Sequence, residues 1–205
     1  MKPLTATVFV VDDDDAVRSS LRLLLKSVGL PVSLHASGQD FLASYDPTQP
    51  GCLVLDIRMP GMSGLELQRH LSLRGAIIPI VFITGHGDVP MAVEAMQYGA
   101  FDFLQKPFRD QDLIDRVQRA FEKDAATRRE LGEIGRIQAR IASLTARERE
   151  VLALVTSGKA NKVVAAELKV SPRTVEIHRA RVMEKMETQS LAQLVRMVME
   201  VERHR

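Results

Sequence analysis

The chain has 205 residues, 45% of them hydrophobic and 26% charged, which is enough for one or two ordinary globular cores. No apolar run approaches the ~20 residues that a membrane-spanning helix needs, and the start of the chain lacks a signal-peptide pattern. The single cysteine, Cys52, lies in an apolar run and is expected to be a packing residue rather than a reactive thiol. We therefore expect a cytoplasmic protein without a membrane segment.

The net charge of +2 conceals a difference between the two ends of the chain. Residues 1–121 carry 11 lysines and arginines against 14 acidic residues, whereas residues 145–205 carry 12 against 8. An acidic front and a basic rear are typical of a signalling domain joined to a nucleic-acid binder. Chance also produces differences of this size, so the charge alone is weak evidence.

Apolar runs alternate with helical periodicity through residues 1–121. The runs predict strands near 7–11, 32–36, 51–56, 79–84 and 102–105, and the segments between them predict helices near 14–28, 38–45, 64–73, 89–98 and 110–121. Strands that alternate with helices across short links form βαβ units, in which helices cover both faces of a parallel sheet. This region is therefore expected to be an α/β domain with a doubly wound, five-stranded parallel sheet.

Residues 122–144 lose the strand pattern and are rich in charge. A sparse apolar series at helical spacing predicts a helix with a narrow stripe, formed by Leu131, Ile134, Ile137, Ile141 and Leu144. The stripe fits either a solvated helical linker over 122–142 or a linker that packs on a partner chain. Gly132 and Gly135 weaken the helix in both cases.

From residue 143 to 205 the sequence predicts an all-α domain of short helices. Thr145 and Glu148 form a capping box before the first of them. Ser171 followed by proline is a well-formed helix start. Later helices are expected over about 161–168, from Pro172 to about Met186, and over about 190–201.

Acidic residues follow two of the predicted strands, and a lysine follows a third. Asp12 to Asp15 come after the first strand, Asp56 ends another, and Lys106 follows the last. Parallel strands end along one edge of the sheet, where open α/β folds keep their sites. Crowded carboxylates persist there only with a compensating cation, such as Mg²⁺ with oxygen ligands or a lysine. We expect a site that handles phosphate; a structural salt-bridge cluster is the alternative.

The polar positions make residues 1–121 resemble a response-regulator receiver domain. They are Asp12-Asp13, Asp56 followed by Met59-Pro60-Gly61, Thr84 and Lys106-Pro107, in the order and spacing of that family. Residues 143–201 resemble a LuxR-type helix-turn-helix through Leu144-Thr145, Arg147-Glu148, Glu150-Val151-Leu152, Gly158, Asn161-Lys162, Thr174-Val175 and His178. The combination is that of the NarL/FixJ group, and residues 85–96 are close to its FixJ branch.

The resemblance implies that Asp56 accepts a phosphoryl group from a sensor histidine kinase. The implied Mg²⁺ ligands are Asp13, Asp56, the backbone carbonyl of Arg58, and Asp12 through water. Phosphoryl oxygens would be bound by Thr84 and Lys106. Asp14 and Asp15 are expected to cap the first helix instead, and His86 to be an ordinary loop residue.

The resemblance also implies a conformational switch. Thr84 would move toward the phosphoryl group and Phe103 would turn into the space it leaves, which remodels the helix near 89–98. Phe103 as an ordinary core residue is the alternative. FixJ-like receivers dimerise through this face, so the interface candidates are Val89, Pro90 and Val93. We do not expect Val93 and Met96 both to point outward.

In the rear domain the helix 172–186 is the expected DNA-reading element. Its buried stripe would be Val175, His178, Val182 and Met186. In the major groove Ile177 would contact thymine methyl groups, and the Glu176 carboxylate would accept a hydrogen bond from cytosine. Ala180 and Arg181 would also face the DNA. Phosphate contacts are expected from Asn161, Lys162, Arg173, Thr174 and Arg179. The sequence departs from the family pattern at two positions. Val163 stands in place of a polar residue. Ala160 stands in place of the usual serine or threonine before Asn161, which removes an N-cap hydrogen bond worth ~1 kcal/mol.

These features predict a transcription regulator, not an enzyme, whose phosphorylation promotes homodimerisation and binding to double-stranded DNA. By family analogy it is an activator, for which RNA polymerase is a further partner. An aspartyl-phosphate hydrolase would need a second aspartate two residues after Asp56, where Arg58 stands. The remaining alternative is a rear domain that sequesters another protein instead of binding DNA.

Overall fold

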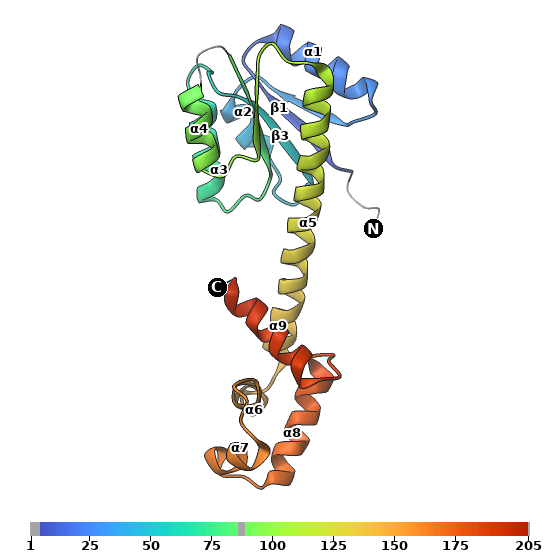
Figure 1. Cartoon of the computed structure of the whole chain (residues 1–205), viewed down its shortest axis with the longest axis vertical. Coiled ribbons are helices and arrows are strands. Elements are labelled where there is room, and N and C mark those ends of the chain that lie inside the picture. Colours follow the sequence, from blue (N-terminus) through green and yellow to red (C-terminus); the bar gives the residue numbers. More distant parts are fainter. Residues whose placement is uncertain (1–4, 86–88, 205) are drawn as a thin grey trace. The chain divides into compact units, whose positions relative to one another are not determined.

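A computed structural model describes residues 5–85 and 89–204 of the chain, with the backbone alone at Val89. Its contacts divide the chain into two compact units, residues 1–128 and 129–205 (Figure 1). Within the described ranges, no helix combines the length and the hydropathy that a bilayer span requires.

The first unit is built on a parallel sheet with strand order β2-β1-β3-β4-β5. The strands are β1 (Thr7–Val11), β2 (Val32–His35), β3 (Gly51–Asp56), β4 (Ile80–Thr84) and β5 (Asp102–Gln105), each within one residue of its predicted bounds. The central strands are buried on both faces, which is why their sequences are almost continuously apolar.

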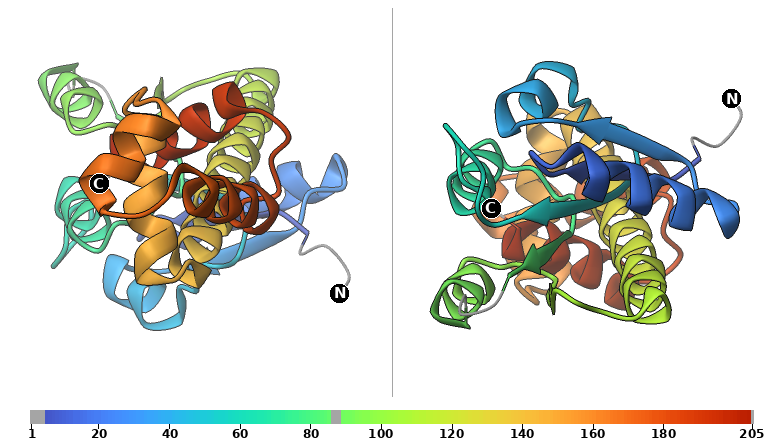
Figure 2. Two further views of the ribbon diagram at one scale, coloured as in Figure 1. Left: turned by 90° about the horizontal axis from the view of Figure 1, so that it is seen from below. Right: turned by 90° about the horizontal axis from the view of Figure 1, so that it is seen from above.

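Helices cover both faces of this sheet, as the sequence predicts (Figures 1 and 2). They are α1 (Asp15–Ser27), α2 (Gly38–Ser44), α3 (Gly64–Leu73), α4 (Val89–Gln97) and the beginning of α5 (Asp110–Ser143). Because side chains alternate along a strand, Val8 and Val10 pack with α1 and α5, whereas Phe9 and Val11 pack with α2 and α3. The predicted doubly wound fold is confirmed.

The early part of α5 belongs to the first unit as far as Arg128. The buried Asp124 carboxylate accepts hydrogen bonds from the backbone N–H of Gly51 at 3.0 Å and from Arg128 Nε at 2.8 Å. The Arg128 guanidinium also donates to the carbonyls of Pro47, Thr48 and Gln49. These bonds attach the helix to the loop before β3, seven residues beyond the end of the domain expected from the sequence.

The second unit is all-α. It contains α6 (Ala146–Thr156), α7 (Asn161–Leu168), α8 (Pro172–Lys185), α9 (Leu191–Arg203) and the end of α5. Thr145 and Glu148 form the predicted capping box of α6, and Ser171 caps α8. The start of α7 has no side-chain cap at Ala160, as expected.

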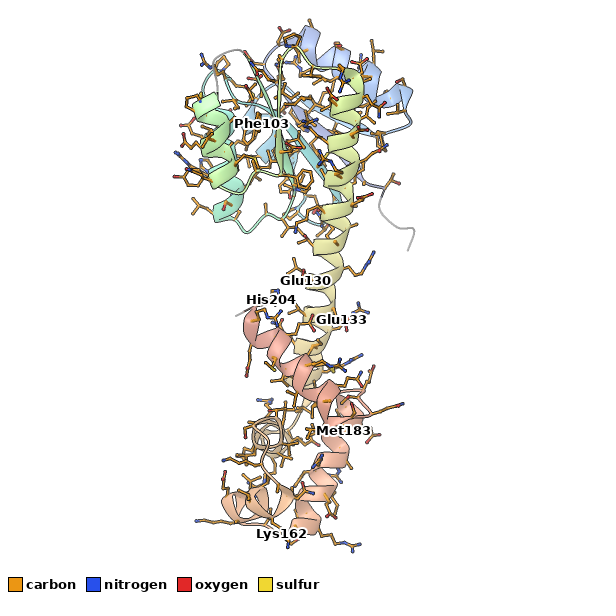
Figure 3. All side chains as sticks on the ribbon, in the orientation of Figure 1. Phe103, Glu130, Glu133, Lys162, Met183 and His204 are labelled. Carbon is orange, nitrogen blue, oxygen red and sulfur yellow. The ribbon has the colours of Figure 1, made fainter. Side chains whose placement is uncertain are left out.

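The end of α5 differs from both interpretations of residues 122–142. Ile134 and Ile137 are buried with Val182 of α8 and Leu194 of α9, so most of the apolar stripe is core of the second unit. His204 Nε2 lies 3.3 Å from Glu130 Oε1 and adds a polar contact between α9 and α5 (Figure 3). Ile134 and Ile137 are therefore neither solvated nor available to a partner chain, because α8 and α9 cover them, whereas Leu131 at the start of the stripe is 43% exposed.

Candidate functional site

The acidic residues and the lysine converge at one edge of the sheet. Asp12 follows β1, Asp56 ends β3, and Lys106 follows β5. Lys106 Nζ donates to Asp56 Oδ1 at 2.8 Å and to Asp12 Oδ2 at 3.0 Å. Residues separated by 50 and 94 positions are thus joined, because parallel strands end side by side.

Asp12 is only 2% exposed, and its oxygens are all engaged. Oδ1 accepts from the backbone N–H of Asp14 at 2.9 Å, Oδ2 accepts from Lys106, and the carbonyl accepts from Arg18 Nη1 at 2.7 Å. Asp14 caps α1 through the N–H of Ala16, as predicted. Asp12 therefore organises the turn between β1 and α1.

Asp56 is half-buried, and its second oxygen accepts from the backbone N–H of Arg58 at 2.7 Å. Burial raises the pKa of Asp56 above its usual value; the Lys106 ammonium offsets part of this rise, and the charge of Asp12 adds to it. Burial lowers the pKa of Lys106, but hydrogen bonds and attraction from Asp56 and Asp12 outweigh burial and hold it above the usual value. Lys106 therefore stays charged and only partly neutralises the pocket.

The donor atoms in this pocket suit a hard cation. Asp13 is exposed, and its carboxylate has no side-chain partner among the described residues. In residues 5–85 and 89–204 no three His, Cys, Asp or Glu side chains already converge as a metal cluster. Mg²⁺ nevertheless keeps several waters and needs only one or two carboxylates. The oxygens of Asp13 and Asp56 and the Arg58 carbonyl have the right chemistry for it.

Thr84 and Phe103 lie on neighbouring strands beside the pocket. The Thr84 hydroxyl donates to the carbonyl of Gly85 at 3.0 Å and is not bonded to Asp56 or Lys106. Phe103 is 40% exposed, so it is not the core residue of the alternative interpretation (Figure 3). His86 lies outside the described residues.

The exposed face of α4 is apolar. Val93 is 52% exposed and Met96 41%, so the expectation that only one of them faces outward is wrong. Residues three apart lie on the same face of a helix, and Ala92 and Ala95 supply the buried face instead. Pro90 is exposed as well, and the side chain of Val89 lies outside the described part.

The contacts that hold α4 to α3 could not be predicted from the sequence. Gln68 is 3% exposed, and its Nε2 donates to the carbonyls of Ala95 at 3.0 Å and Tyr98 at 3.2 Å. Arg69 pairs with Glu94 at 2.6 Å. A glutamine on a helix is ordinarily solvated, so only the fold reveals that its amide satisfies carbonyls at the end of α4.

In the second unit α8 divides as predicted. Val175, Val182 and Met186 are buried, and His178 is half-buried with its Nδ1 enclosed and unpartnered among the described residues. The opposite face exposes Arg173, Glu176, Ile177, Ala180 and Arg181.

Two of the expected phosphate contacts bond to each other. Arg179 is half-buried, and its Nη1 donates to Asn161 Oδ1 at 3.0 Å. The Thr174 hydroxyl lies 2.8 Å from the Ser171 hydroxyl at the start of α8. Lys162 at the start of α7 is exposed (Figure 3). The next residue, Val163, is exposed as well.

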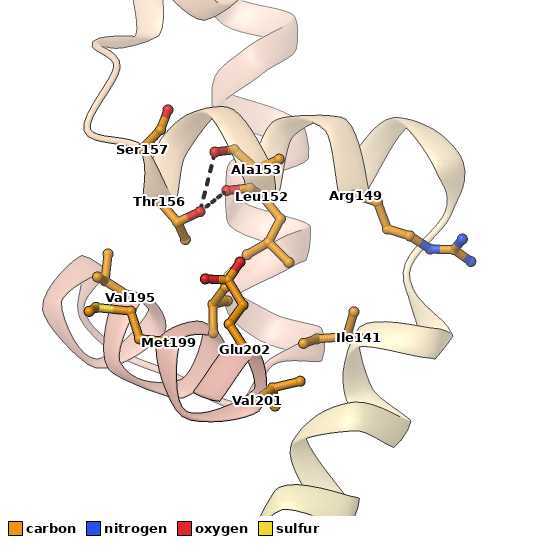
Figure 4. Close-up of a pocket in the computed structure, with 11 residues that line it drawn as sticks. Ile141, Arg149, Leu152, Ala153, Thr156, Ser157, Val195, Met199, Val201 and Glu202 are labelled. Atoms are coloured by element: carbon orange, nitrogen blue, oxygen red, sulfur yellow. Dashed lines mark hydrogen bonds between the residues drawn. The ribbon is translucent and has the colours of Figure 1, made fainter. Parts of the chain in front are cut away.

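The second unit also contains a mostly apolar cavity of about 430 Å³ between the end of α5, α6 and α9 (Figure 4). Ile141, Leu152 and Met199 contribute to its wall, together with Glu202. None of the candidate DNA contacts lines it. The cavity is therefore separate from both candidate sites.

Family models match both parts of the chain. Residues 8–118 match the response regulator receiver domain, and residues 142–198 match the luxR family of bacterial regulatory proteins. The transcriptional regulatory protein FixJ of Azorhizobium caulinodans is 50% identical over 197 residues, or 96% of this chain and 93% of that protein. Nodulation protein W of Bradyrhizobium diazoefficiens is 49% identical over 192 residues, or 94% of this chain and 85% of that protein.

Solved structures give the same result. The response regulator StyR is similar with a TM-score of 0.85 and 46% identity, over 96% of this chain and 99% of that one. Full-length FixJ from B. japonicum is similar with a TM-score of 0.60 and 43% identity, over 97% and 98%. The receiver domain implies a histidine kinase as a partner, and the LuxR-type domain implies DNA. Similarity along nearly the whole chain shows that it belongs to the FixJ-like response regulators, which are transcription regulators controlled by phosphorylation.

Proposed function

We propose that Asp56 is the phosphoacceptor, and that its phosphorylation promotes dimerisation, DNA binding and activation of transcription. The supporting observation is that Asp56 lies at a strand end within 2.8 Å of a charged lysine. A carboxylate oxygen of Asp56 attacks the phosphorus of a phosphohistidine on the kinase. The O–P bond forms, the P–N bond breaks, and the leaving imidazole takes up a proton.

Asp13, Asp56 and the Arg58 carbonyl would hold Mg²⁺, with Asp12 acting through water. The bound ion screens the charge of the incoming phosphoryl oxygens. The Lys106 ammonium then donates its hydrogen bond to a phosphoryl oxygen in place of an Asp56 carboxylate oxygen. The Thr84 hydroxyl donates to a second phosphoryl oxygen in place of the Gly85 carbonyl. This exchange of acceptors draws Thr84 toward the pocket.

The groove beside the pocket is suited to the kinase. It has a volume of about 420 Å³ and lies between α1 and the segment after β5. Its apolar wall includes Val17, Leu21 and Phe108, and Lys106 also lines it. A kinase helix bound there brings its phosphohistidine close to Asp56, because Lys106 already touches that carboxylate.

The exposed face of α4 and β5 would become the dimer interface. When Thr84 moves, Phe103 turns inward from its exposed position, which changes this surface. Pro90, Val93 and Met96 then pack against a second copy, and Val89 stands at the same end of α4. Two copies place two α8 helices on a DNA site of matching two-fold symmetry.

In the cytoplasm, each α8 helix of the dimer would enter a major groove of the DNA. Ile177 and Glu176 face bases together with Ala180 and Arg181, while phosphate contacts come from Asn161, Lys162, Arg173, Thr174 and Arg179. As an activator, the bound dimer would also contact RNA polymerase.

Two experiments test this function. Incubation with acetyl phosphate and Mg²⁺ should label the wild-type chain and the control Asp46→Asn, but not Asp56→Asn, as judged by intact mass. A label that persists on Asp56→Asn overturns the assignment. Titration with duplex DNA at several salt concentrations should show a steep log–log slope. No binding by the phosphorylated chain at low salt would favour sequestration of another protein.

A further inference from the structure

Arg18 is largely buried although it lies on the outer helix α1. Its side chain is 14% exposed, whereas that of its ion-pair partner Asp15 is 87% exposed. Nη1 donates to the carbonyl of Asp12 at 2.7 Å, and Nη2 donates to Asp15 Oδ1 at 2.9 Å. One rigid guanidinium therefore connects the end of β1 to the start of α1.

Asp13 lies between two fixed neighbours. The N–H of Asp12 donates to the carbonyl of His35 at 3.3 Å, its carbonyl accepts from Arg18, and its side chain is bonded as described above. On the other side Asp14 caps α1. Asp13 has no side-chain partner of its own among the described residues, so the position of its carboxylate depends on how these two neighbours are held.

We propose that Arg18 is a positioning residue for the cation site. Its two hydrogen bonds fix the turn between β1 and α1, so that the Asp13 carboxylate is held ready to bind Mg²⁺. Arg18 acts through the Asp12 backbone and touches neither the cation nor the phosphoryl group. The inference rests on the proposed function, because it requires Asp13 to be a metal ligand.

The charge of Arg18 and its hydrogen bonds have opposite effects on a nearby cation. The guanidinium repels Mg²⁺, so loss of its charge alone would tighten binding. Loss of its hydrogen bonds frees the turn, and the loss of such an outer partner typically weakens metal binding by about 10–100-fold. The direction of the change in Mg²⁺ affinity therefore separates positioning from simple electrostatics.

The experiment measures Mg²⁺ binding to the full-length chain by calorimetry. Arg18→Met keeps the apolar stem but loses both hydrogen bonds and the charge, and should weaken binding about tenfold. Arg18→Lys keeps the positive charge, but its single ammonium nitrogen cannot reproduce both guanidinium hydrogen bonds, so it should restore only part of the Mg²⁺ affinity. Arg22→Met is the matched control, because Arg22 is exposed on the same helix and has no side-chain partner among the described residues. It should leave affinity within about twofold of the wild type or tighten it slightly.

Affinity in Arg18→Met equal to or tighter than that of the wild type would overturn the inference while leaving the proposed pocket intact. A wild-type chain that binds no Mg²⁺ would overturn the pocket and the inference together. Circular dichroism checks that each variant is folded. If Arg18→Met does not fold, Arg18→Lys carries the test, since it must then bind Mg²⁺ more weakly than the wild type.

Discussion

Arg179 Nη1 donates a hydrogen bond to Asn161 Oδ1 at 3.0 Å, and this bond joins α8 to the start of α7. The sequence predicts a phosphate contact for each of these two side chains. In the structure one orients the other, at a helix start that lacks a side-chain cap. Substitution of Arg179 therefore affects both the stability of the unit and its affinity for DNA.

Arg179→Ala should weaken binding to all DNA sequences alike and reduce the magnitude of the salt slope by about one, because a phosphate contact carries no base information. It should also lower the free energy of unfolding by about 0.5–1.5 kcal/mol, since an internal hydrogen bond is lost. Competition binding with single-base variants and urea unfolding measure the two effects. Arg173→Ala, at an exposed position, is the control and should change only DNA binding. A loss confined to one base pair would contradict the phosphate role.

Lys106→Met should make the free energy of unfolding depend more strongly on pH and on Mg²⁺ than it does in the wild type. Burial already raises the pKa of Asp56, so ionisation of this carboxyl opposes folding. The opposition is absent below the unfolded pKa and grows as pH rises toward the folded value. Without the Lys106 ammonium the folded pKa rises further, and the loss of stability at neutral pH increases.

Urea unfolding of Lys106→Met between pH 4 and 8 should therefore show stability falling as pH rises, more steeply than in the wild type. Mg²⁺ should restore stability at neutral pH, because it replaces the missing positive charge. Lys26→Met, at an exposed position of α1, is the matched control. If the free energy of unfolding depended on pH in the same way in Lys106→Met and the wild type, the electrostatic role of the lysine would be refuted.

Glu148→Gln should remove a pH-dependent part of the stability of the second unit. The hydrogen bond from Lys185 and then that from the Thr145 N–H lower the pKa of Glu148 from 4.5 to about 2. A lowered pKa stabilises the folded state above the unfolded value of 4.5, and this stabilisation is lost as pH falls toward 2. Between these two pH values, the unfolding temperature should change more steeply with pH in the wild type than in Glu148→Gln. Glu150→Gln, in an exposed ion pair, should retain the wild-type slope.

Gly132→Ala and Gly135→Ala should each stabilise the chain by about 0.5–1 kcal/mol, because alanine is the better helix former. Beyond the adjacent backbone of α5 itself, a Cβ at either position meets no atom of the described residues within 4 Å, so no steric cost opposes the gain. Urea unfolding measures the change. Gly64→Ala is the opposite control, because its Cβ would clash with the carbonyl of Asp56. Destabilisation by either α5 substitution would show that these glycines are required in the folded state.

The elements of both units could be predicted because their signals are local. Apolar runs placed the strands, periodicity placed the helices, and caps such as Thr145 and Ser171 placed helix starts. The pocket could be predicted as well, since topology alone brings Asp12, Asp56 and Lys106 to one edge. The outward positions of both Val93 and Met96 could not, because exposure depends on which other side chains fill the interior.

The order of residues by itself determined the sheet, the helices, the residue types at the acidic edge and the family. Tertiary structure alone decided that Arg18 holds Asp12, that Gln68 holds the end of α4, and that the stripe of Ile134 and Ile137 is covered by α8 and α9. The physical reason is range. A periodic pattern or a cap is set by neighbours within a few residues, whereas the partner of a buried polar or apolar side chain is chosen by packing between segments distant in the chain.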